Sequence, residues 1–112
     1  MATLDSLTRL KDGWNGYAAP APSDLAIDNA RRFCSWALDP SRIAPSAAGG
    51  VDLTFKRGDR WVVVELLNGG PASVFYSAGD TAPRSERFHP RDERFATLAT
   101  VLTNYLLPTD GA

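Results

Sequence analysis

The chain has 112 residues, of which 44% are hydrophobic and 22% charged, and its formal net charge is −1. This length predicts a single domain over residues 1–112, with a core large enough to fold without disulfides or a metal. Basic and acidic residues are spread evenly along the chain, which argues against nucleic acid as a partner, because such a partner requires a one-sided basic field.

The cellular setting follows from what the sequence lacks. Cys34 is the only cysteine, so no intramolecular disulfide can form, and its place in an apolar helical pattern indicates a small buried side chain. No stretch approaches the roughly 20 apolar residues of a membrane span, and the first residues lack the basic and apolar regions of a signal peptide. We therefore expect a cytoplasmic protein with no membrane association.

Two helices are predicted in the first part of the chain. Leucines at helical spacing predict a short helix over residues 3–11, which Gly13 ends. Ser23 is a typical N-cap for a second helix that ends before Pro40. Its apolar face is formed by Ala26, Ile27, Ala30, Phe33, Cys34 and Ala37.

The loop between these helices, residues 13–23, contains two large aromatic residues, Trp14 and Tyr17. Burial of such rings is a major source of folding free energy. We therefore predict that this loop packs as an ordered part of the domain.

The second half of the chain changes to the period of strands. Alternation predicts an antiparallel meander of three to four strands, over 51–56, 61–67, 73–78 and 84–88, and a short edge strand could lie near Ile43 in the preceding connector. A two-residue turn at Gly58-Asp59 would pair Phe55 with Val62, Leu53 with Val64 and Val51 with Leu66, all on one face.

A last helix is predicted from Pro90 to Pro108, with its apolar stripe packed on one face of the sheet. The complete prediction is an α+β domain with two N-terminal helices, the antiparallel meander and this C-terminal helix.

Three motifs resemble those of a group of small bacterial proteins of no assigned function. Those proteins have a helix, the loop Gly-Trp-Asp-Gly-Tyr-Gly-Ala followed by prolines, a second helix and a short sheet. Asn15 replaces the acidic residue of that loop and Ala18 replaces a glycine. The resemblance covers residues 4 to 78 and implies a shared fold, with no reaction attached. The matching residues are Gly13, Trp14, Gly16, Tyr17, Ala19, Pro20, Pro22, Ala44-Pro45-Ser46, Gly49-Gly50-Val51, Val64, Glu65, Asn68 and Gly70.

The candidates for catalysis are few. His89 precedes a proline with no nucleophile pattern nearby, so we interpret it as a surface or helix-start residue. The predicted hairpin places Asp52 opposite Glu65, and like charges directly opposite each other are destabilising. Such a pair could hold a divalent ion, act as a general acid/base couple or receive an arginine of a partner, unless a lysine or arginine lies between the two carboxylates or a bulge separates them. Phosphate-binding and metal-binding motifs are absent from the sequence. We therefore predict no catalytic residues, no metal site and no cofactor, and a protein that is not an enzyme.

The sheet face opposite the predicted core carries a second group of apolar residues. Trp61, Val63 and Leu67 share this face with Glu65 and Lys56. Helices in one layer cannot cover both faces, so this face is covered by the aromatic loop or the first helix, covered by a second copy, or left exposed to a partner.

The favoured hypothesis is a non-enzymatic protein-binding module, such as a stoichiometric inhibitor or accessory protein of bacterial, phage or mobile-element origin, of the anti-defence or immunity type. The arginines near the last helix are interleaved with acids, which indicates a mixed-charge surface rather than a phosphate site. Two alternatives stay open: a small-ligand or metal-binding domain or minor enzyme using Asp52 and Glu65, and a structural homodimer. The predicted partner-binding residues are Trp61, Glu65, Tyr76, Arg84, Arg87, Arg91 and Arg94.

Overall fold

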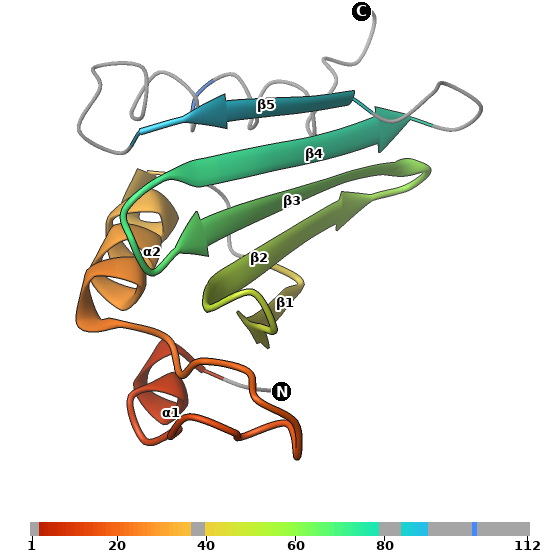
Figure 1. The fold of residues 1–112 in the computed structure, drawn as a ribbon. Coiled ribbons are helices and arrows are strands. Elements are labelled where there is room, and N and C mark those ends of the chain that lie inside the picture. Colours follow the sequence, from red (N-terminus) through yellow and green to blue (C-terminus); the bar gives the residue numbers. More distant parts are fainter. Residues whose placement is uncertain (1–2, 37–39, 79–83, 90–99, 101–112) are drawn as a thin grey trace, which may run out of the picture.

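A computed structural model describes residues 3–36, 40–78, 84–89 and 100. Two helices are followed by an antiparallel sheet in which the strands lie in chain order (Figure 1). This arrangement confirms the α+β class, the two N-terminal helices and the meander. The elements are α1 (Leu4–Leu7), α2 (Asp24–Trp36), β1 (Arg42–Ser46), β2 (Gly50–Arg57), β3 (Arg60–Leu67), β4 (Ala72–Ala78) and β5 (Arg84–Phe88).

The predicted number of strands was wrong, because the sheet of the described part has five strands rather than three to four. The additional strand is β1, which contains Pro45. Proline donates no hydrogen bond and is tolerated only at an edge, and β1 pairs with β2 alone among the described strands. The predicted helix from Pro90 to Pro108 lies outside the described residues.

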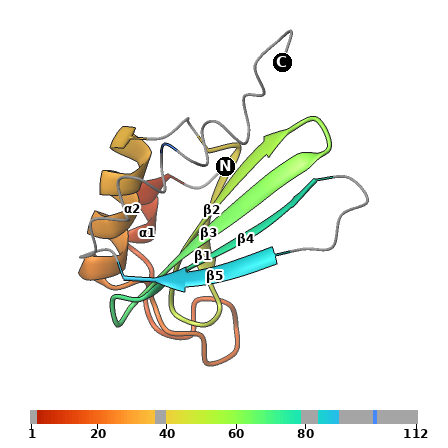
Figure 2. The same cartoon turned by 90° about the horizontal axis from the view of Figure 1, so that it is seen from above.

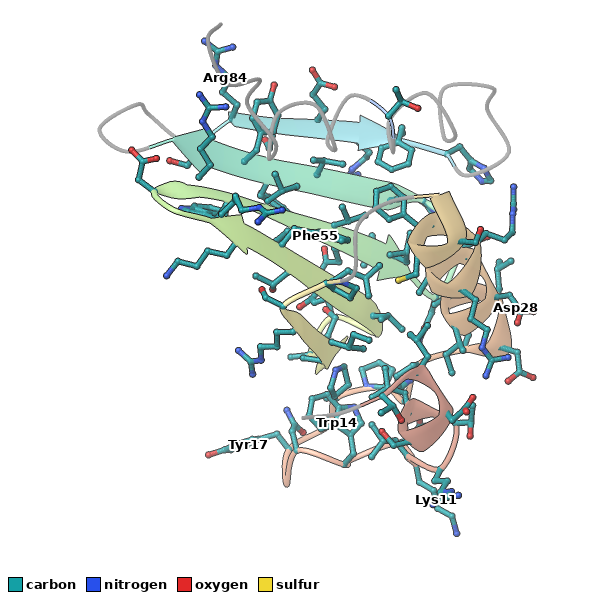
Figure 3. The ribbon with its side chains drawn as sticks, turned by 180° about the vertical axis from the view of Figure 1, so that it is seen from behind. Lys11, Trp14, Tyr17, Asp28, Phe55 and Arg84 are labelled. Carbon is teal, nitrogen blue, oxygen red and sulfur yellow. The ribbon has the colours of Figure 1, made fainter. Side chains whose placement is uncertain are left out.

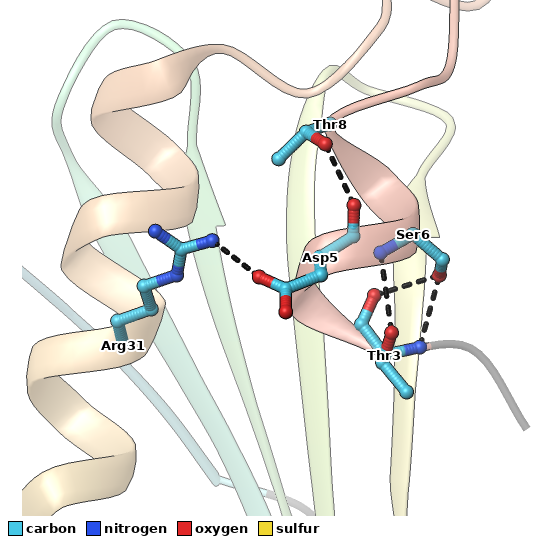
Figure 4. Close-up of polar contacts among 5 residues, drawn as sticks. All are labelled: Thr3, Asp5, Ser6, Thr8 and Arg31. Carbon is cyan, nitrogen blue, oxygen red and sulfur yellow. Dashed lines mark hydrogen bonds and ion pairs between the residues drawn. The ribbon is translucent and has the colours of Figure 1, made fainter.

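Helix α1 is shorter than the predicted 3–11 because local side chains hold both of its ends. The Thr3 hydroxyl accepts from the Ser6 amide at 3.1 Å, and the Ser6 hydroxyl accepts from the Thr3 amide at 3.0 Å (Figure 4). At the other end, the Thr8 hydroxyl donates to the Asp5 carbonyl oxygen at 2.6 Å. Threonine bonds of this kind compete with continuation of a helix.

Helix α2 begins where the sequence predicts. The Ser23 hydroxyl accepts from the Ala26 amide at 3.1 Å and so caps the helix. Along the helix, Arg31 reaches Asp5 of α1 at 2.7 Å (Figure 4). Both side chains of this ion pair are largely exposed, so it contributes little to stability. The apolar face of α2 packs on β2 and β3, with the helix on one side of the sheet (Figure 2).

The core lies between α2 and the hairpin formed by β2 and β3. The predicted register is confirmed, with Phe55 opposite Val62, Leu53 opposite Val64 and Val51 opposite Leu66. All six side chains are buried, and the Phe55 ring lies 5.8 Å from the ring of Phe33 on α2. The turn at Gly58 has the positive φ of +60° that a type II′ turn requires at its first central position.

Asn68 joins the first helical region to the sheet across a long stretch of chain. Its side-chain oxygen accepts from the Ser23 amide at 2.6 Å, and its side-chain nitrogen donates to the Ala21 carbonyl oxygen at 2.8 Å. Its own amide donates to the Gly49 carbonyl oxygen at 3.0 Å, in the turn before β2. Asn68 therefore holds the start of α2, the aromatic loop and two sheet turns together.

The aromatic loop is ordered by hydrogen bonds rather than by burial of both rings. The Trp14 indole nitrogen donates to the Pro20 carbonyl oxygen at 3.0 Å, and the Asn15 side-chain oxygen accepts from the Tyr17 amide at 2.9 Å. Tyr17 is 85% exposed, so the ring of this residue is not what packs the loop against the domain. Its side chain points away from the body of the molecule (Figure 3).

Candidate functional site

The candidate site is the sheet face opposite α2, which we call the outer face. Side chains alternate along each strand, so every second residue faces away from the core that α2 covers. The outer face consists of Arg42, Ala44, Ser46, Asp52, Thr54, Lys56, Trp61, Val63, Glu65, Leu67, Ser73, Phe75, Ser77, Ser85 and Arg87.

The outer face keeps apolar side chains in contact with solvent. Phe75 is 40% exposed, and Trp61, Val63 and Leu67 are each only partly buried. Val63 pairs with Phe75, so these two side chains lie side by side at the centre of the face. Trp14 and Tyr17 of the aromatic loop lie beside α1, at the end of the molecule away from β4 and β5 (Figures 1 and 3).

Two acidic side chains meet beside this apolar group. Asp52 pairs with Glu65 across β2 and β3, as the sequence predicts. The Ser46 hydroxyl donates to the Glu65 carboxylate at 2.7 Å. Oδ1 of Asp52 is buried and has no hydrogen-bond partner among the residues that the structure describes.

Burial and the neighbouring carboxyl of Glu65 change the titration of Asp52. Burial, the charge of Glu65 and a hydrogen bond with Glu65 together raise the pKa of Asp52 from 3.8 to about 6, and burial is the largest of these causes. The nearby Arg42 opposes this rise. One proton shared by the pair removes most of the repulsion between two carboxylates on neighbouring strands. Asp52 can therefore release or take up a proton in mildly acidic solution.

The acidic pair is not accompanied by further metal ligands. No group of three or more His, Cys, Asp or Glu side chains suited to a metal ion occurs within the described ranges. The arrangement fits proton exchange or pairing with a basic group better than metal binding.

The structure separates the predicted partner-binding residues into two groups. Trp61, Glu65 and Arg87 lie on the outer face. Tyr76 pairs with Val62 and Arg84 on the opposite face, where Tyr76 packs against the core. Arg84 is exposed on β5, at one end of the strand (Figure 3).

Two other predicted partner-binding residues, Arg91 and Arg94, lie outside the described residues. The ring of His89 lies beside Gly70, its Nε2 3.3 Å from the position that a Cβ on this glycine would occupy. His89 is therefore partly buried beside the turn between β3 and β4.

Sequence reasoning did not single out the most exposed apolar residue of the outer face, Phe75, or its neighbour Ser73. The alternation of β4 was visible, but the turn before it could have several lengths, so it did not settle which of Phe75 and Tyr76 faces outward. Ser46 was also missed as a partner of Glu65, because the two are 19 residues apart in the chain.

Comparisons of the chain with protein families, with curated proteins and with solved structures found no match. Within the described ranges, no helix combines the length and apolar character that a membrane crossing requires.

Proposed function

We propose that the protein is a non-enzymatic binding module that docks another protein on the outer face of its sheet. The observation that carries this proposal is the group of solvent-contacting apolar side chains, Trp61, Val63, Leu67 and Phe75, on a face that α2 leaves uncovered. Exposed apolar groups of this kind on a small domain mark interaction sites.

The polar residues of the outer face define the partner further. Charged side chains of both signs lie around the central pair of Val63 and Phe75: Glu65 is on β3, and Arg42 and Arg87 are on the edge strands of the described sheet. An apolar centre with a charged rim is the common composition of a protein–protein interface. The partner is thus a folded protein or segment with an apolar patch and charges of its own. The rigid sheet lets such a module inhibit its partner by occlusion.

The test is retention of a partner by immobilised protein from a lysate of the source cells. Trp61→Ala and Phe75→Lys should each weaken retention of that partner about thirtyfold, as truncation of a central aromatic contact does. Tyr17→Lys is the matched control, because Tyr17 is an exposed aromatic residue away from the outer face.

A partner retained equally by all three variants would contradict the proposal. Sedimentation of the wild type alone distinguishes the structural homodimer, in which the retained partner is a second copy of the chain. In that case the same two substitutions would convert a dimer into a monomer, while Tyr17→Lys would not.

A further inference from the structure

A hollow of about 300 Å³ opens on the outer face between β4 and β5. It is lined by Ser73 and Phe75 of β4 and by Ser85, Glu86 and Arg87 of β5. Ser73 pairs with Arg87, and Phe75 pairs with Ser85, so these four side chains are neighbours on one face. Alternation directs the side chain of Glu86 to the other face.

The charge of Arg87 faces this hollow, and no carboxylate among the described residues forms an ion pair with it. Within residues 3–36, 40–78 and 84–89, the one ion pair is that of Arg31 with Asp5. Glu65 occupies the same cross-strand row as Arg87, but β4 lies between them, at a separation of about 10 Å for two strand spacings. An anion from outside the chain can therefore pair with Arg87.

The lining favours a particular kind of anion. A guanidinium binds a carboxylate through two parallel hydrogen bonds, and the hydroxyls of Ser73 and Ser85 are further donors beside it. The exposed ring of Phe75 provides an apolar wall for the carbon atoms that carry the carboxylate. The volume is at the lower end of the range for ligand sites, which fits a single side chain or a small molecule.

Glu65 distinguishes between the possible anions. A doubly charged phosphate in the hollow would be repelled by Glu65 about twice as strongly as a singly charged carboxylate. The site is thus better suited to a carboxylate than to a phosphate group.

We propose that this hollow binds a carboxylate, and that the carboxylate is an acidic side chain of the protein that docks on the outer face. The second half of this inference rests on the proposed function, and the first half does not. On this proposal, the partner is a protein with an aspartate or glutamate next to its apolar patch.

The carboxylate site is tested with benzoate as the probe and benzamide as its neutral counterpart. In the ¹⁵N-labelled full chain, benzoate should shift the amide resonances of Ser73, Phe75, Ser85 and Arg87 with saturation, while benzamide should not. Arg87→Gln should weaken benzoate binding about tenfold or more, which corresponds to loss of a charge-assisted pair.

Arg42→Gln is the matched control, since it makes the same change on the opposite edge strand of the same face. Both arginines are exposed, so neither variant removes a buried contact. Equal shifts with benzamide, unchanged benzoate affinity in Arg87→Gln, or equal loss in Arg42→Gln would overturn the site.

The origin of the carboxylate is tested on the retained partner. Arg87→Gln should weaken its retention about tenfold, and benzoate should compete with it. If Trp61→Ala releases the partner while Arg87→Gln and benzoate have no effect, this inference fails and the proposed function stands. If benzoate binds in the hollow but no outer-face variant affects retention, the proposed function fails, and with it the assignment of the carboxylate to a partner.

Discussion

Gly50, the first residue of β2, has no space for a side chain against β3. A Cβ at this position would lie 2.1 Å from the Leu66 carbonyl oxygen, and the backbone φ is +146°. We expect Gly50→Ala to lower the free energy of unfolding by about 3 kcal/mol or more, because backbone strain and steric overlap add. Urea denaturation measures this loss.

The matched control for this change is Gly58→Ala in the turn between β2 and β3. Gly58 also has a positive φ, of +60°, but a Cβ there would meet no atom within 4 Å. Its loss should be only about 1 kcal/mol, since strain acts without overlap. Equal losses at the two glycines would show that the contact with Leu66 is relaxed at little cost.

Asp52 makes the stability of the protein depend on pH. Its pKa is about 6 in the folded protein against 3.8 for the free group, so the folded state holds a proton that the unfolded state has released. Stability from this group is therefore complete below pH 3.8 and is lost as the pH rises through about 6. We expect a loss of about 1–2 kcal/mol between pH 4 and 7, a value reduced for partial exposure.

Asp52→Asn should abolish this dependence, because the amide keeps the shape and a hydrogen bond to Glu65 but does not ionise. Urea denaturation at several pH values should show the variant more stable than the wild type at pH 7 and equal to it at pH 4. Asp28→Asn, on the exposed side of α2, is the control and should leave the slope unchanged. If the stability of Asp52→Asn falls with rising pH as steeply as that of the wild type, Asp52 is not the group that causes the pH dependence.

At the scale of elements, Asn68 connects the start of α2 and the aromatic loop to the turn that follows β3. Asn68→Ala removes the bonds to Ser23 and Ala21 and leaves their partly buried groups without these partners. We expect a loss of about 2–3 kcal/mol and faster hydrogen exchange in the first turn of α2. Asn68→Asp keeps the side-chain oxygen that accepts from the Ser23 amide, so its free energy of unfolding should fall by less than that of Asn68→Ala. Equal losses in the two variants would contradict a contribution of the bond to Ser23.

The elements that could be predicted are those that local chemistry determines. A two-residue turn at Gly58-Asp59 predicts one pairing register for β2 and β3. The alternation of apolar residues on both sides of this turn predicts the same register, which is the one observed. The strand β1 was only suggested, because Pro45 interrupts the pattern of a strand. The role of Asn68 was not visible, because its side-chain partners are 45 and 47 residues away and no local pattern connects them.

The same limit applies to the candidate site. The pairing of Asp52 with Glu65 followed from the tight turn, and so did the outward position of Trp61. The sequence between β3 and β4 does not define the length of the turn. A difference of one residue in this length places each side chain of β4 on the opposite face of the sheet. This is why Tyr76 was predicted on the binding surface, while Phe75 occupies the outer face.

For the whole molecule, the proposals above require a sheet with two unlike faces, and neighbouring residues of β4 test this. Val74 is 1% exposed in the core, whereas Phe75 is 40% exposed on the outer face. Val74→Ser should cost about 3 kcal/mol, because it leaves a cavity and buries a hydroxyl. Phe75→Ser should cost about 1 kcal/mol, since it removes only a cross-strand contact.

Urea denaturation of the two variants compares a small loss of volume in the core with a much larger one on the outer face. Phe75→Ser removes more side-chain atoms, so a fully covered outer face would make it the more damaging change. If Val74→Ser is the more damaging change, as we predict, the ring of Phe75 gains little from folding and is available to a partner. A cost for Phe75→Ser equal to or above that of Val74→Ser would remove the basis for docking on this face.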